Sequence, residues 1–155
     1  MIMSRIDFYH LQRQSLEEVL PKLLEKAYKT VDGGGILLKI GTSERLEFLN
    51  TLLWTYNDES FLPHGSKKDG FAAQQPIWLT SDDGNANRAK YLFLTDGAIA
   101  DISFLHEFER VFNIFDGNSE DSLQQARDFW KQCKASDFEL YYWQQKSDGT
   151  WEHKA

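Results

Sequence analysis

The clearest hydrophobic pattern in the chain covers residues 119–134, SEDSLQQARDFWKQCK, and it is typical of an amphipathic helix. Ser119 is placed to cap the helix, and the two residues after it are acidic, as the first turn of a helix favours. Apolar residues recur every three or four positions and define one face, made of Leu123, Ala126, Phe129, Trp130 and Cys133. We therefore expect a helix that buries this face in the core.

A stripe of cations borders the apolar face. Because successive helical residues are about 100° apart, Arg127, Lys131 and Lys134 lie about one turn apart, beside Trp130. One interpretation is a solvated face, in which the lysines complement the C-terminal end of the helix dipole and Asp128 pairs with one of them. The other is a docking site for a short acidic peptide with an apolar end, held by the cations and by a crevice beside Trp130.

Strand and helix patterns alternate in the early and late parts of the chain. Runs rich in β-branched, aromatic and leucine residues predict strands at 6–10, 36–40, 76–80, 91–95, 111–115 and 138–143, the last as an edge strand. Two more helices are expected, one after Ser15, with Pro21 bending it or shifting its start, and one after Thr42 or Ser43. A short helix fits residues 104–108.

This order of elements predicts an α/β fold, a three-layer sandwich with a mostly parallel central sheet. Residues 1–144 are expected to form a single α/β domain. Residues 145–155 are expected to form a polar C-terminal tail, with room for a turn at 147–149 that brings Trp151 back.

Composition and charge limit the classes of partner that the chain is expected to bind. The chain has 155 residues, including Trp 5, Tyr 6 and Phe 11, enough for one ordinary core. A formal net charge of −7 argues against a broad nucleic-acid surface, so any contact with DNA is expected to be indirect. No apolar run approaches the length of a membrane span and the N-terminus lacks a secretory pattern, so we expect no membrane contact and a cytoplasmic protein. Cys133 is expected to be a small buried hydrophobe.

The sequence offers little for catalysis. The four histidines are widely separated and none has metal-ligand spacing, so we predict no metal, no cofactor and no catalytic residue; His64 is expected to be a hydrogen-bonded loop residue. The glycines at 33–35 follow a helix and open a strand, whereas phosphate loops follow a strand and open a helix. Residues 41–43, GTS, have the right place but lack the later glycines and lysine. A nucleotide-dependent enzyme of doubly wound α/β fold is the alternative hypothesis.

A second candidate site is the loop at residues 57–65, NDESFLPHG, where turn-forming residues enclose Phe61 and Leu62. Phe61 either folds back on the core or forms an exposed apolar patch for a protein partner. The sequence alone leaves both open.

Several stretches together resemble the chi subunit of bacterial DNA polymerase III holoenzyme. They are IDFYHL, LEEVLPKLLEKAY, LLWTYNDESFLPHG, QPIWLT, FERVFNIFDG, SLQQARDFWKQCKAS and DFELYYWQQ, with compatible spacing over nearly the whole chain. The most specific part is Trp54 followed by residues 60–64, SFLPH. Residues 31–39 are less typical, because a glycine run stands where the family commonly has a basic turn.

The resemblance implies a non-catalytic accessory protein on a Rossmann-like α/β fold without a nucleotide site. Such a protein forms a heterodimer with the psi subunit, through which it joins the clamp loader. It also binds the acidic C-terminal tail of single-stranded-DNA-binding protein, which ends in a phenylalanine bearing the terminal carboxylate.

The resemblance also implies roles for residues of the predicted helix at 119–134. Arg127 would hold the terminal carboxylate of the tail, Lys131 the preceding acids, and Trp130 would wall the phenylalanine pocket. A basic family position one turn earlier falls on Gln124, or on Leu123 with a one-residue gap, and this departure would affect affinity rather than binding itself.

Two further matches complete the expectations. Lys134 matches a basic position of the family and would add long-range attraction. Phe61 matches the family residue associated with psi and with a helicase partner, and Trp54 and Leu62 would support it.

Overall fold

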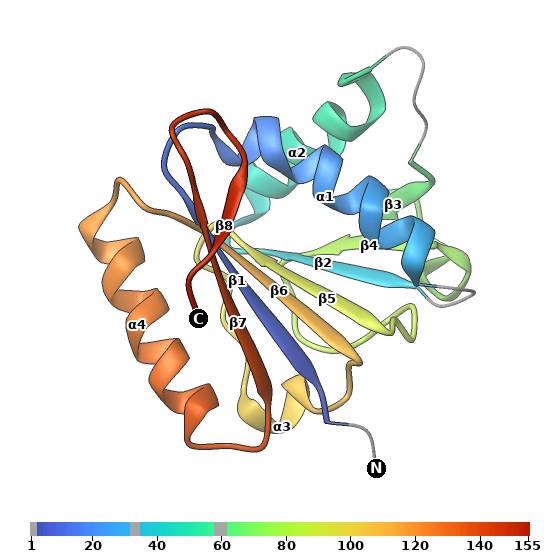
Figure 1. Ribbon diagram of the computed structural model, residues 1–155. Coiled ribbons are helices and arrows are strands. Elements are labelled where there is room, and N and C mark those ends of the chain that lie inside the picture. The colour runs from blue at the N-terminus through green and yellow to red at the C-terminus, as the bar shows by residue number, and fades with distance from the viewer. Residues whose placement is uncertain (1–2, 32–34, 58–61) are drawn as a thin grey trace.

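One eight-stranded sheet runs through the computed structural model, which describes residues 3–31, 35–57 and 62–155. Its strands are β1 (Arg5–Leu11), β2 (Ile36–Ile40), β3 (His64–Ser66), β4 (Ile77–Thr80), β5 (Tyr91–Thr95), β6 (Arg110–Asp116), β7 (Glu139–Gln145) and β8 (Trp151–His153). Their order across the sheet is β3-β4-β2-β5-β6-β1-β7-β8. All neighbouring pairs are parallel except β7 and β8 (Figure 1).

Helices cover both faces of this sheet. They are α1 (Leu16–Thr30), α2 (Ser43–Thr55), α3 (Ile102–Leu105) and α4 (Glu120–Lys134), with a short 3-10 helix at Ala72–Gln74. The side chains of α1 and α2 join one hydrophobic cluster and those of α3 and α4 join another, on opposite sides of the sheet (Figure 1). The predicted α/β three-layer sandwich with a mostly parallel sheet is therefore confirmed.

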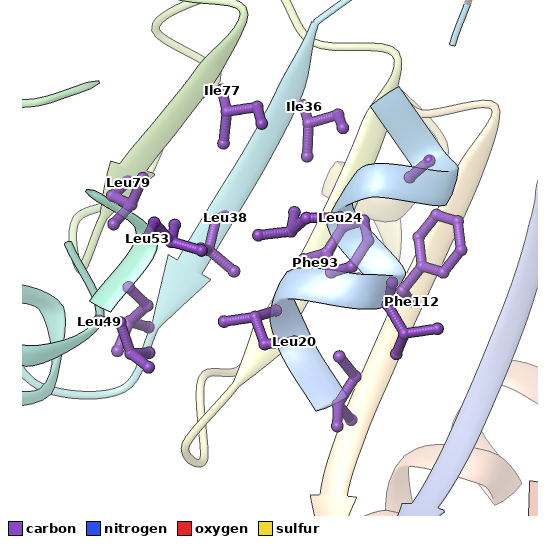
Figure 2. Close-up of a cluster of buried hydrophobic side chains, with 14 of the residues drawn as sticks. Leu20, Leu24, Ile36, Leu38, Leu49, Leu53, Ile77, Leu79, Phe93 and Phe112 are labelled. Carbon is purple, nitrogen blue, oxygen red and sulfur yellow. The ribbon is translucent and has the colours of Figure 1, made fainter. Parts of the chain in front are cut away.

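The cluster beneath α1 and α2 shows how the alternating strand pattern becomes a core. Figure 2 shows leucines of both helices pointing at side chains of β2, β4, β5 and β6. The fully buried members include Leu20, Leu24, Leu49, Ile36 and Phe93. Burying each such side chain contributes about 1.5–3 kcal/mol, so this layer supplies much of the driving force for folding.

Local sequence signals set the start of α1 as predicted. Ser15 Oγ accepts a hydrogen bond from the Glu18 N–H at 3.3 Å, and Glu18 Oε1 accepts one from the Ser15 N–H at 3.2 Å. Pro21 lies inside the helix and is buried, and the helix continues to Thr30. Pro21 therefore neither ends the helix nor moves its start.

The amphipathic prediction for α4 is confirmed. Ala126 and Cys133 are buried, and Leu123, Phe129 and Trp130 are partly buried against the same cluster. Burial raises the pKa of the Cys133 thiol to about 12, so the thiol stays protonated and unreactive near neutral pH. The expectation of a small buried hydrophobe is confirmed as well.

Two short strands were missed by sequence reasoning. Residues 64–66 form the edge strand β3, so His64 is a buried strand residue rather than a loop residue. It is hydrogen-bonded as expected, with ring Nδ1 2.6 Å from the Leu62 carbonyl oxygen and Nε2 3.2 Å from that of Asn50. A three-residue strand is too short to leave a recognisable alternation in the sequence.

The segment expected to be a polar tail adds β8, which makes β7 an inner strand, and the turn at 147–149 brings Trp151 back as the sequence allowed. Gln145, only 1% exposed, explains why. Its side-chain oxygen accepts from the backbone N–H groups of Arg13 and Gln14, both at 3.0 Å, and its amide nitrogen donates to the Gly149 carbonyl at 3.3 Å. One amide thus ties the β7–β8 hairpin to the β1–α1 loop, and Trp151 packs on the core.

Replacing Gln145 with leucine should destabilise the fold by about 2–4 kcal/mol, because it leaves backbone N–H groups without an acceptor. Urea denaturation followed by circular dichroism measures this loss. The matched control is Gln144→Leu, at a partly exposed neighbour on the same strand, which should cost less than about 1 kcal/mol. Equal losses for the two variants would contradict the role of Gln145.

Candidate functional site

The cation stripe predicted on α4 is present at the surface. Arg127, Lys131 and Lys134 are exposed, and no ion pair within the described parts of the chain involves them. Asp128 does not pair with a lysine. Its carboxylate instead accepts a hydrogen bond from the Gln124 amide at 3.0 Å. Lys131 and Lys134 lie in the last turn, where they complement the helix dipole. Of the two interactions that the solvated-face interpretation requires, the lysines at the C-terminal end of the helix are present and the ion pair of Asp128 is not.

Trp130 lies at the seam between α4 and the sheet. Its ring is 5.0 Å from that of Phe8 on β1 and 5.8 Å from that of Tyr142 on β7, both in edge-on contact. The residue is only partly buried, so part of it remains accessible to a ligand. Trp130 therefore offers an apolar surface directly beside the exposed cations.

The floor of the seam is a small polar and aromatic group at the end of β1. His10 Nδ1 lies 2.6 Å from the Tyr142 hydroxyl, and the His10 ring is 5.1 Å from that of Phe115. Gly117 packs so closely that a Cβ there would lie 2.1 Å from the His10 ring, so only glycine fits. His10 and Tyr142 are thus held in fixed positions beside Trp130.

The positive charge of Arg127 affects the pKa values of His10 and Tyr142. Burial lowers the pKa of His10, and the positive charge of Arg127 lowers it further. Burial raises the pKa of Tyr142, and Arg127 opposes that rise. Both groups stay neutral near pH 7, and the nearby carboxylate of Asp116 acts on the pKa of His10 in the opposite sense to Arg127.

Sequence reasoning predicted Arg127, Trp130, Lys131 and Lys134 as site residues and did not include His10 and Tyr142 of the sheet. The alternation of β1 places Phe8 and His10 on the face toward α4, and that of β7 places Tyr142 on the same face. Only the order of strands shows that β1 and β7 are neighbours, so the sequence offered no sign that His10 and Tyr142 meet.

Gln124, one of the two positions expected to match the basic family residue, lies away from the seam. It contacts Asp128 and lines a cleft on the other side of α4, away from Trp130. A side chain there does not share the seam with Arg127. Of the residues predicted to bind the tail, Trp130 contacts Tyr142 at the seam and Arg127 lies near enough to Tyr142 to affect its pKa, while Lys131 and Lys134 continue the exposed stripe along the helix.

The second predicted site lies around the segment before β3. Phe61 falls outside the described residues. Trp54, at the end of α2, is 49% exposed and its ring lies 4.1 Å from that of His64. Leu62 is 2% exposed and belongs to the core cluster, so it supports the surface from beneath.

The structure explains the glycine after β2. A Cβ at Gly41 would lie 1.9 Å from the Asp96 carbonyl oxygen, so glycine is needed there for close packing of two loops. Thr42 is used as the N-cap of α2, where its hydroxyl accepts from the Arg45 N–H. Within the described residues no three His, Cys, Asp or Glu side chains are grouped to hold a metal ion. None of the described helices combines the length and apolarity that a membrane span requires.

Comparison with known proteins decides the family. Residues 3–141 match the family model described as DNA polymerase III chi subunit, HolC. The chain belongs to the DNA polymerase III chi-subunit family. A relative from Rickettsia prowazekii (strain Madrid E), described as probable DNA polymerase III subunit chi, is 33% identical over 111 residues. That match covers 71% of this chain and 66% of the relative's length.

The family match includes α4, Phe8 and His10, whereas Tyr142 and β8 lie beyond its last residue, 141. The cations and Trp130 of the candidate site therefore belong to the part of the chain that carries the likeness.

Replacing Arg127 with alanine should raise the pKa of His10, because a positive charge that opposes its protonation is removed. The imidazole proton shifts of His10, followed by NMR over pH 4–8, measure this. Lys134→Ala is the control, since the His10 pKa shift has no contribution from Lys134. An unchanged His10 titration in the Arg127 variant would show that the guanidinium does not point into the seam.

Proposed function

We propose that this chain is a non-catalytic accessory subunit of DNA polymerase III that binds two other proteins. One is the psi subunit of the clamp-loader complex, as a heterodimer. The other is single-stranded-DNA-binding protein, through its acidic C-terminal tail. Family membership supports the place in the replication machinery. The cytoplasmic replication fork is then its site of action, and its contact with DNA is indirect.

The observation that carries the tail proposal is the unpaired cation stripe beside a half-buried indole. The stripe is cationic on a chain of net charge −7, which favours the encounter of this surface with an acidic peptide. Arg127 presents a planar, forked donor suited to a terminal carboxylate. Trp130 offers the apolar contact that the terminal phenylalanine requires.

The rest of the stripe acts at longer range. Lys131 and Lys134 are exposed and attract the acids that precede the phenylalanine. Gln124 adds no charge and contacts Asp128, which is consistent with a modest affinity for a single tail. Several tails on one coated strand would compensate, because a second contact benefits from a high effective concentration.

The psi surface is assigned to the region of Trp54. Trp54 is one of the exposed large apolar side chains, and Leu62 anchors the segment beside it in the core. Phe61 is the residue proposed to contact psi, on the strength of its family position. A helicase partner would use the same surface and would therefore compete with psi.

Reversing the charge at Arg127 or Lys131 should weaken tail binding at least tenfold without changing the fold. Fluorescence anisotropy with a fluorescein-labelled acidic peptide ending in Pro-Phe measures the affinity. Lys22→Glu on α1 makes the same charge change on the opposite face and should have little effect. Binding should also weaken as salt rises from about 0.05 to 0.3 M.

Two peptide controls sharpen this test. An amidated C-terminus removes the carboxylate, and Phe replaced by Ala removes the apolar end; each should reduce binding. Full affinity for the amidated peptide, or for the Arg127→Glu protein, would exclude Arg127 as the group that holds the carboxylate.

Phe61→Ala should weaken association with psi and leave tail binding unchanged. Co-purification of the variant with tagged psi measures the first, and peptide anisotropy the second. Phe71→Ala is the matched control, because Phe71 is exposed elsewhere on the surface. Undiminished recovery of psi with the Phe61 variant would remove Phe61 from the interface.

A further inference from the structure

A large cleft lies on the side of α4 away from the cation stripe. Its volume is about 1240 Å³, and it is bordered by the residues that follow β1, β5 and β6 and by one side of α4. At this place the chain leaves β1 through α1 on one face of the sheet and leaves β6 through α4 on the other (Figure 1). Crevices at such a switch point, outside the carboxyl ends of parallel strands, are where α/β folds bind ligands.

The cleft carries an excess of negative charge. Exposed carboxylates line it, belonging to Glu18, Asp101, Asp116, Asp121 and Asp128. Two cations also line it, fewer than the carboxylates, and one of them is paired with carboxylates. Arg45 binds Glu17 and Asp96, the latter at 3.1 Å, and Arg13 donates to the Ser147 carbonyl at 3.1 Å. The exposed carboxylates of the lining therefore have no cationic partner within it.

This charge opposes phosphate. The helix N-termini that open on the cleft already carry acids in their first turns, Glu17 and Glu18 in α1 and Glu120 and Asp121 in α4. These positions are where a nucleotide-binding α/β protein receives phosphate on free backbone N–H groups. A cationic ligand suits the cleft, and its size exceeds the 300–1,000 Å³ or so that encloses a small molecule.

An exposed apolar side chain lies at the rim of the cleft. Ile99 is 70% exposed, and its backbone is fixed because its carbonyl accepts from the buried ammonium of Lys39 at 2.8 Å. Lys39 is held in turn by Asp83 at 2.9 Å. Phe129 of α4, partly buried, also lines the cleft. The cleft thus combines a positioned aliphatic side chain and an aromatic one with carboxylates.

We propose that this cleft docks an extended basic peptide of a partner protein, with an aliphatic or aromatic residue against Ile99 and Phe129. Lysine and arginine side chains on either side of that residue bind Asp101 and Asp128. The site is separate from the tail site, because α4 presents acids to the cleft and cations to the seam. One helix therefore separates two surfaces that select peptides of opposite charge.

The test uses an acetylated, amidated, fluorescein-labelled octapeptide of Lys and Arg around a central Leu-Phe. It should bind the intact protein, and the double variant Asp101→Asn/Asp128→Asn should weaken binding about fivefold or more. Ile99→Ser should weaken it about threefold, since an exposed apolar contact is lost. Asp137→Asn, at an exposed aspartate outside the cleft, is the control for loss of a carboxylate elsewhere on the surface and should bind like the wild type.

Further measurements distinguish a peptide from other ligands and the cleft from the tail site. The peptide with Gly-Gly in place of Leu-Phe should bind more weakly, and Arg127→Glu should not weaken binding of the basic peptide. Equal affinity for the Asp137 control and the double variant would overturn the proposal. Displacement of the peptide by millimolar ATP would overturn it in favour of a nucleotide. Displacement by spermine, together with no effect of Ile99→Ser, would show a polycation site without peptide selectivity and would overturn it as well.

Discussion

The arrangement of the sheet depends on one buried carboxylate. Asp7, fully buried on β1, accepts two hydrogen bonds from Arg5 at 2.8 and 2.9 Å, one from Arg110 on β6 at 3.3 Å, and one from the Trp143 indole on β7 at 2.9 Å. A buried charge is tolerated only when it is paired and hydrogen-bonded, so these partners must be present together. They join β6, β1 and β7, and they fix β7 beside β1. Because Tyr142 and Phe8 lie on the other face of these strands, the floor beneath Trp130 follows from the same constraint.

The charge pattern of α4 connects fold and function. Its apolar face fixes the rotation of the helix on the sheet, and this rotation directs Arg127 toward the seam and Asp128 toward the cleft. A single rotational setting thus creates both a cationic and an anionic surface. The net charge of the chain, −7, describes neither of them. For an accessory subunit that works through protein partners, the local arrangement of charge is what determines the partner.

Sequence reasoning was strongest where periodicity and caps agree. The capping box at Ser15 and the apolar spacing of α4 correctly predicted helices and their buried faces. It was weakest where the fold depends on contacts between distant segments. The hairpin that ends in β8 is held by Gln145 through backbone groups near residue 13, and a lone glutamine has no signature for this. At the candidate site the helix residues were visible because they share one element. His10 and Tyr142 became visible only once β1 and β7 were paired.

The burial of Cys133 has a practical consequence. The chain contains one cysteine, and its thiol is fully buried behind α4. A cysteine engineered at the surface would therefore be the sole target of thiol-reactive dyes, without removal of the native one. A fluorophore attached in this way on either side of α4, in a separate variant for each side, would report occupancy of each surface independently. Labelling of the native sulfur would instead time the transient detachment of the helix from the sheet.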